Sequence, residues 1–158
     1  MLTVAAVGQI VLAIVLYNNP GNTGLRNAGW GVLMISGLFG WLPIYTFRQK
    51  GGVAKGKGYV NTTVLVNSGV YGIVRHPQYL AGILMSLALA MLAQNWVVTL
   101  LGAIAAAMYY VSVYQEEASS VEKFGEAYTR YMREVPRFNF VAGIWRRMRH
   151  DRTSNNHQ

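Results

Sequence analysis

Four apolar stretches, each close to the length of a membrane-spanning helix, dominate this chain of 158 residues. They comprise residues 2–17, 28–47, 77–93 and 96–114. A helix that crosses the hydrocarbon core needs about 20 residues, within a range of about 17–25. The second and fourth stretches fit that length, the third lies at its lower edge, and the first is marginal. The sequence therefore predicts an all-α membrane protein with about four transmembrane helices.

The composition supports this class and excludes several chemistries. Hydrophobic residues make up 53% of the chain and charged residues only 13%, whereas soluble domains carry about 25% charged residues. The chain has no Cys, which excludes disulfides, thiolate metal sites and a Cys nucleophile. Its three His are too scattered to form a set of metal ligands. We therefore expect no bound metal.

The basic residues predict the orientation of the spans. The net charge is +8, and 13 of the 14 Lys and Arg lie in residues 48–75 or after residue 114. Four spans place both of these regions on the same side as the N-terminus, and the positive-inside rule makes that side cytoplasmic. We therefore expect a multi-pass protein with both termini in the cytoplasm. The basic excess is explained by topology and by contact with anionic membrane lipids, so a nucleic-acid partner is not needed.

The acidic residues all follow the fourth apolar stretch. In residues 116–132, apolar or aromatic side chains recur at helical spacing, which predicts a cytoplasmic amphipathic helix. The stretch from residue 146 to residue 158 is polar and basic and is expected to be a frayed tail. The sequence thus predicts one membrane domain, residues 1–145, followed by the tail, residues 146–158.

A helical hairpin is predicted for the last two spans. Pro77 suits the first position of a helix, and the sequence AQNW at residues 93–96 predicts a tight turn. His76 lies twenty residues before Trp96 and Glu116 lies twenty after it, so both reach the same cytoplasmic level. The side chains expected at this hairpin mouth are Arg75, His76, Tyr79, Glu116 and Glu117. This grouping fits a functional site and, equally, a headgroup-binding Arg75 beside a solvated glutamate pair.

Two segments of the chain resemble a known enzyme family. These are TTVLVNSGVYGIVRHPQYLAGIL at residues 62–84 and YQEEASSVEKFGEAYTRYMREVPRF at residues 114–138. Their R-H-P-x-Y, E-E, F-G-x-x-Y and V-P-R motifs are similar in order and spacing to those of integral-membrane methyltransferases. Isoprenylcysteine carboxyl methyltransferase typifies that family, and phospholipid N-methyltransferases share much of the pattern. The resemblance covers about residues 60–138, which is half of the chain.

The resemblance implies S-adenosylmethionine as cofactor, bound at the cytoplasmic hairpin mouth, and a lipid-like or prenylated acceptor. The cofactor contacts that it implies are Thr63, Val64, Leu65, Val66, Tyr71, His76, Pro77, Gln78, Tyr79 and Glu116. It assigns catalytic roles to Arg75, Tyr79 and Glu116, and contacts with the acceptor to Ser112 and Glu117. In this reading, the Glu116 carboxylate pairs with the amino group of the cofactor, and the tyrosines contact adenine or the sulfonium.

The chain departs from the family at the acceptor side. Isoprenylcysteine enzymes usually carry an Arg four residues before the first Glu of the pair, and this chain has Ser112 there. A prenylcysteine carboxylate therefore has no evident anchor, and the sequence does not identify the acceptor.

Two other functions stay open. Sterol reductases, which bind NADPH, also carry an R-H-P-x-Y element, but they place a Cys-containing stretch where this chain has YQEEASSVEKFG. A non-catalytic four-span scaffold would bind no cofactor at all.

Overall fold

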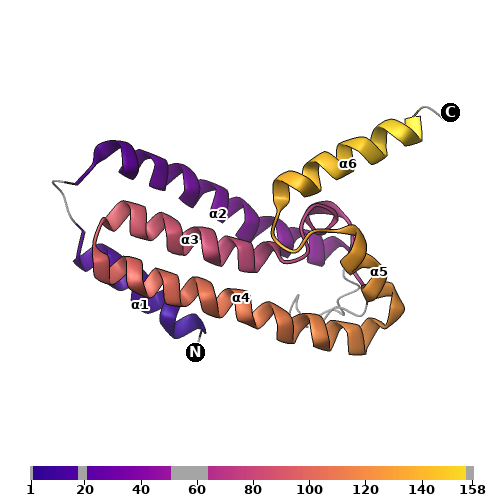
Figure 1. The fold of residues 1–158 in the computed structure, drawn as a ribbon, viewed down its shortest axis with the longest axis horizontal. Helices are drawn as coiled ribbons and strands as arrows, with labels where there is room; N and C mark the ends of the chain where they lie inside the picture. Colours follow the sequence, from indigo (N-terminus) through magenta and orange to yellow (C-terminus); the bar gives the residue numbers. More distant parts are fainter. Residues whose placement is uncertain (1, 18–20, 51–63, 156–158) are drawn as a thin grey trace. The chain divides into compact units, whose positions relative to one another are not determined.

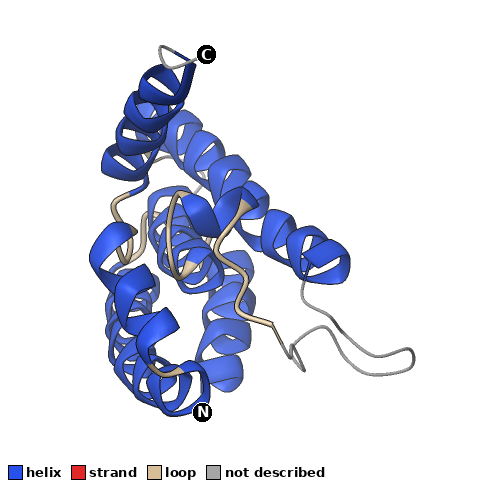
Figure 2. Ribbon diagram, turned by 90° about the vertical axis from the view of Figure 1, so that its right-hand side faces the viewer, coloured by secondary structure: helices blue, strands red, loops and turns tan. Residues whose placement is uncertain are grey.

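The computed structural model describes residues 2–17, 21–50 and 64–155, and over these ranges its regular structure is entirely helical (Figures 1 and 2). The α-helices are α1 (Leu2–Val15), α2 (Thr23–Lys50), α3 (Pro77–Ala93), α4 (Trp96–Phe124), α5 (Glu126–Glu134) and α6 (Phe140–Asn155). A short 3-10 helix, η1 (Gly69–Gly72), precedes α3. The all-α prediction is confirmed for the described residues.

Two of these helices, α2 and α4, are long and apolar enough to cross a bilayer. The helices α1 and α3 are also apolar but shorter. Large apolar side chains such as Val4, Met34 and Leu100 are exposed along these helices. An exposed apolar surface of this extent is unfavourable in water and favourable against lipid. The helices are therefore compatible with a membrane protein, while the number of spans stays a prediction.

The chain divides into two compact units. Unit 1 comprises residues 1–40 and 78–116, and unit 2 comprises residues 41–77 and 117–158. In unit 1, polar side chains join neighbouring helices. The buried Gln9 amide of α1 donates to the carbonyl oxygen of Ser86 at 2.9 Å, and Ser36 Oγ of α2 donates to that of Ala81 at 2.8 Å. Such hydrogen bonds help helices to associate in lipid, where the hydrophobic effect does not drive packing.

The predicted turn between the third and fourth apolar stretches is confirmed, since α3 ends at Ala93 and α4 begins at Trp96. Gln94 has a positive φ of 49°. Its side-chain amide also accepts from and donates to the backbone of Asn22, at 2.7 Å in both directions. The two helices pack closely, because Gly82 of α3 leaves room for the ring of Tyr109 on α4. A Cβ at this glycine would lie 2.4–2.6 Å from carbon atoms of that ring.

Two sequence-based expectations for the C-terminal region need correction. The helix expected over residues 116–132 is interrupted at Gly125, whose φ of 58° suits glycine and ends α4. The region expected to be a frayed tail is helical as far as Asn155. Asn139 begins that helix, since its side-chain oxygen accepts from the backbone N–H of Ala142 at 3.0 Å, as N-cap residues do.

Candidate functional site

The segment from residue 64 to residue 76, in unit 2, is held from two sides. The ring of Tyr71 in η1 lies 4.6 Å, centroid to centroid, from that of Phe47 near the end of α2. The Tyr131 hydroxyl of α5 donates to the carbonyl oxygen of Tyr71 at 2.7 Å. Burial raises the pKa of Tyr131, so this hydroxyl stays neutral and keeps its proton for the bond. Gly69 has a positive φ of 65°, which allows the turn into η1.

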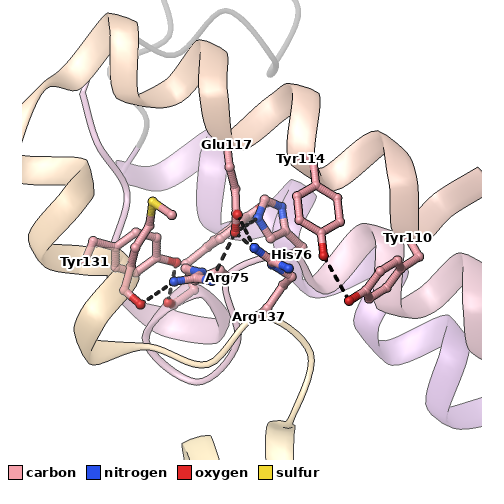
Figure 3. Close-up of polar contacts among 9 residues, drawn as sticks. Arg75, His76, Tyr110, Tyr114, Glu117, Tyr131 and Arg137 are labelled. Carbon is pink, nitrogen blue, oxygen red and sulfur yellow. Dashed lines mark hydrogen bonds and ion pairs between the residues drawn. The ribbon is translucent and has the colours of Figure 1, made fainter.

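A buried carboxylate, that of Glu117 on α4, gathers three partners in unit 2 (Figure 3). Its Oε1 lies 3.0 Å from Arg75 Nη2 and 3.1 Å from His76 Nε2. Arg137 donates to both carboxylate oxygens, through Nη2 at 2.6 Å and Nε at 3.2 Å. We call these four residues the Glu117 cluster. It joins α4 to the loop before α3 and to the segment after α5.

The hydrogen bonds and charges around Glu117 offset the free-energy cost of burying its carboxylate. Burial raises the pKa of the Glu117 carboxyl, but hydrogen bonds from Arg137 and His76 and the charge of Arg75 outweigh it. The net effect lowers the pKa below the ordinary value of 4.5, so the carboxyl is ionised at neutral pH. A carboxylate accepts hydrogen bonds, and Nε2 of His76 must therefore carry the proton in this contact.

Backbone hydrogen bonds reinforce the same junction. The N–H of Arg75 donates to the carbonyl oxygen of Pro136 at 3.0 Å, and that of His76 donates to the carbonyl oxygen of Arg137 at 3.4 Å. The Arg75 guanidinium also donates to the carbonyl oxygen of Met132. Residues 135–137, the V-P-R motif, therefore lie along the Arg75–His76 loop. The R-H-P, E-E and V-P-R motifs, which are distant in the sequence, meet at this point.

The sequence did not nominate Arg137 as a site residue. The signal that could have found it is the V-P-R motif itself, because a basic residue there can reach an acidic residue of the E-E pair. The F-G-x-x-Y motif also contributes, since Gly125 ends α4 and Tyr128 is buried beside Tyr131 and Val135. We call Tyr128, Tyr131 and Val135 the α5 core.

Unit 1 holds a second group of the predicted site residues. The Tyr79 hydroxyl at the start of α3 donates a hydrogen bond to the carboxylate of Glu116, which is exposed to solvent. The ring of Tyr79 also meets that of Tyr109 edge-on, with centroids 6.2 Å apart. The Ser112 hydroxyl donates to the carbonyl oxygen of Met108 at 2.8 Å, within its own helix. The hairpin geometry thus pairs the first turn of α3 with Glu116.

The remaining nominated residues lie as follows. Thr63 is outside the described residues. Val64 is exposed, Leu65 packs against the α5 core, and Val66 is buried. Pro77 is buried at the first position of α3, and Gln78 is half-buried. Nominated residues from 64 to 77 and Glu117 belong to unit 2, whereas Gln78, Tyr79, Ser112 and Glu116 belong to unit 1. Their joint contact with one ligand stays a prediction.

Comparison with known proteins identifies relatives. Residues 28–127 match the family described as phospholipid methyltransferase. Over 74 residues, or 46% of the chain, the sequence is 36% identical to the protein-S-isoprenylcysteine O-methyltransferase of Schizosaccharomyces pombe. The aligned part covers 31% of that relative, so the chain spans about a third of its length. No solved structure gave a significant match. Because the family match extends over more than half of its length and includes the R-H-P-x-Y and E-E motifs, this chain belongs to the phospholipid methyltransferase family.

Proposed function

We propose that this protein is an integral-membrane methyltransferase that takes its methyl group from S-adenosylmethionine and transfers it to a lipid-like or prenylated acceptor. The observation that carries the proposal is the family match over residues 28–127. That region supplies the Tyr79–Glu116 pair and three members of the Glu117 cluster. The name of the fission-yeast relative supports a prenylated acceptor, and the family name supports a phospholipid.

The residues present fit the chemical groups of this cofactor. S-adenosylmethionine carries an ammonium, a carboxylate, a sulfonium and an adenine ring. The exposed Glu116 carboxylate complements the ammonium, and the Tyr79 ring can face a sulfonium. The exposed Val64 offers an apolar surface to adenine. The Glu117 cluster sets two guanidinium groups against one carboxylate, and this excess positive charge suits the carboxylate of the cofactor.

We assign Glu117 a positioning role in place of the acceptor contact that the sequence suggested. Its carboxylate is buried, and both oxygens are bonded to Arg75, His76 or Arg137. By accepting from Nε2, Glu117 fixes the tautomer and the orientation of the His76 ring. The cofactor, when bound, supplies an electrophilic methyl group, and its transfer neutralises the sulfonium. The tasks of the protein are then to align the acceptor and to exclude water.

Ser112 occupies the position where isoprenylcysteine enzymes usually carry an Arg, so this position offers no cation to hold an acceptor. The Ser112 hydroxyl is bonded within its own helix, and Ser112 brings no charge. An acceptor held mainly by its apolar chain, and admitted from the bilayer, therefore fits better than one that needs a carboxylate anchor at this point.

The first expected result separates this function from its alternatives. S-adenosylmethionine or its demethylated product should raise the thermal unfolding midpoint of the purified protein in detergent, whereas NADPH should not. A ligand at a hundred times its dissociation constant adds about 2.7 kcal/mol to the free energy of unfolding. Stabilisation by NADPH would favour a reductase, and stabilisation by neither would favour a scaffold. Transfer of labelled methyl groups to lipids of isolated membranes would then identify the acceptor.

The second expected result concerns topology. We propose four spans (α1, α2, α3 and α4), cytoplasmic termini, and α5 as a cytoplasmic amphipathic helix. Gly56 and Ser154 should then be cytoplasmic, while Asn22 and Asn95 face the other side. Both asparagines accept helix-capping hydrogen bonds, so cysteines are better placed at the neighbouring Gly21 and Trp96.

Single cysteines in this Cys-free chain can be probed with a membrane-impermeant thiol reagent on intact cells. Gly21→Cys and Trp96→Cys should react, and Gly56→Cys and Ser154→Cys should react only after the membrane is opened. Reaction of Gly56→Cys in intact cells would rule out the four-span arrangement.

A further inference from the structure

Helix α6 is fixed to the rest of unit 2 through one face. The backbone of Gly143 approaches η1 so closely that a Cβ there would lie 1.8 Å from the carbonyl oxygen of Ile73. On either side of it, Arg146 donates to the carbonyl oxygen of Gly72 at 2.8 Å and Arg147 to that of Gly69 at 3.3 Å. This face is therefore committed to the segment that leads into α3.

The opposite face of α6 is apolar and exposed. Val141, Ile144, Trp145 and Met148 have exposed fractions of 63%, 42%, 57% and 48%. Their spacing of three, four and seven residues puts them on one stripe of the helix. Gly143 lies about half a turn away from this stripe, which is why one face packs and the other does not. We call these four residues the α6 stripe.

Positive charge borders the α6 stripe at Arg149, whereas Arg146 and Arg147 are bonded to η1 on the other face. The first acidic residue of α6 is Asp151. The Arg149 guanidinium stacks over the Trp145 ring at 3.7 Å from the centroid, which places a cation at the edge of the apolar stripe. An apolar stripe bordered by arginine and containing Trp is typical of helices that lie in the headgroup region of anionic bilayers.

We propose that the α6 stripe docks on the anionic surface of the bilayer. Two observations favour lipid over a protein partner as the occupant. Two helices of the chain are long and apolar enough to cross a membrane, and the charge of Arg149 at the edge of the stripe has the sign that anionic headgroups attract. Because the other face of α6 holds η1, lipid contact would also steady the carbonyl groups of Gly69 and Gly72. The α6 stripe shares no residue with the proposed methyl-acceptor site.

Spin labels can test this proposal in the whole 158-residue chain, which contains no Cys. Ile144→Cys and Met148→Cys place a nitroxide on the α6 stripe, and Glu126→Cys places one on the exposed start of α5 as the matched control. Each labelled protein is reconstituted in vesicles of phosphatidylcholine with or without phosphatidylglycerol. The measured quantity is the accessibility of the label to oxygen, which partitions into lipid, relative to a water-soluble nickel chelate.

The ratio of oxygen to nickel accessibility should be several-fold higher at both stripe positions than at Glu126→Cys, and higher still with phosphatidylglycerol. A water-like ratio at both stripe positions would overturn the proposal. Shielding from both reagents would also overturn it, because it would show that protein covers the stripe. An unfolding midpoint equal to that of the unlabelled protein verifies that each variant is folded. Because two stripe positions are labelled, the test can still be carried out if one variant does not fold.

Discussion

Replacing Glu117 by glutamine is expected to lower the free energy of unfolding by about 3–5 kcal/mol, the usual cost of removing one partner from a buried ion pair. The variant would leave Arg75, whose side chain is only 7% exposed, beside Arg137 without a counter-charge. The measurement is denaturant unfolding in detergent micelles, followed by tryptophan fluorescence. Glu122→Gln, an exposed neighbour on the same helix, should change stability by less than about 0.5 kcal/mol. Equal stability of the two variants would contradict the structural role of the Glu117 cluster.

The pH dependence of stability provides a second test of the role of Glu117. The pKa of Glu117 is lower in the folded protein than its ordinary value of 4.5. Its contribution is therefore fully present above that value and is lost as the pH falls through the folded pKa. The difference in stability between wild type and Glu117→Gln should accordingly shrink in acid, whereas the difference for Glu122→Gln should stay near zero throughout.

Glu116→Gln is expected to weaken binding of the demethylated cofactor by roughly ten- to a hundred-fold. A hydrogen bond to a charged group contributes about 1.5–3 kcal/mol, and about 1.4 kcal/mol corresponds to a factor of ten in affinity. The substitution keeps the shape of the side chain and removes the charge proposed to pair with the cofactor ammonium. Calorimetric titration of wild type, Glu116→Gln and Glu122→Gln measures the effect. His76→Ala should also weaken binding, through loss of the ring that Glu117 orients.

The two neighbouring glutamates are expected to behave in opposite ways. Glu116 is exposed, so Glu116→Gln should unfold at the wild-type midpoint when no ligand is present. Glu117→Gln should be destabilised even without ligand. If Glu116→Gln binds as tightly as wild type, Glu116 is not a cofactor contact, and its bond to Tyr79 is only a structural one.

Local sequence signals predicted the hairpin formed by α3 and α4. Pro77 starts α3 because its missing N–H costs nothing at a first helical position, and the AQNW turn separates α3 from α4 as expected. Counting residues outward from that turn also placed the first turn of α3 opposite Glu116, as the Tyr79 hydrogen bond indicates. These features depend on helix length and turn length, and both can be read from the sequence.

Features that depend on distant contacts could not be predicted. Nothing local distinguishes Glu116 from Glu117, and only the docking of Arg75 and Arg137 determines which carboxylate is buried. Arg137 lies twenty residues beyond Glu117 in the sequence. Backbone hydrogen bonds between residues 75–76 and 136–137 bring its side chain to the Glu117 carboxylate. Two other features did carry local signals. Gly125 marks the end of α4 within the amphipathic pattern, and Asn139 caps the start of α6.

The continuity of α4 limits how this chain can change in length. Glu116 and Glu117 follow one another on a single uninterrupted helix of 29 residues, so their directions differ by a fixed angle of about 100°. Deleting or inserting one residue between the turn at Trp96 and this pair would rotate both carboxylates together by that angle. Glu116 would then be turned away from Tyr79, its hydrogen-bond partner within unit 1. A point substitution in the apolar part of α4 alters packing at one place, whereas a single-residue shift in length would remove this polar contact at a distance from the change.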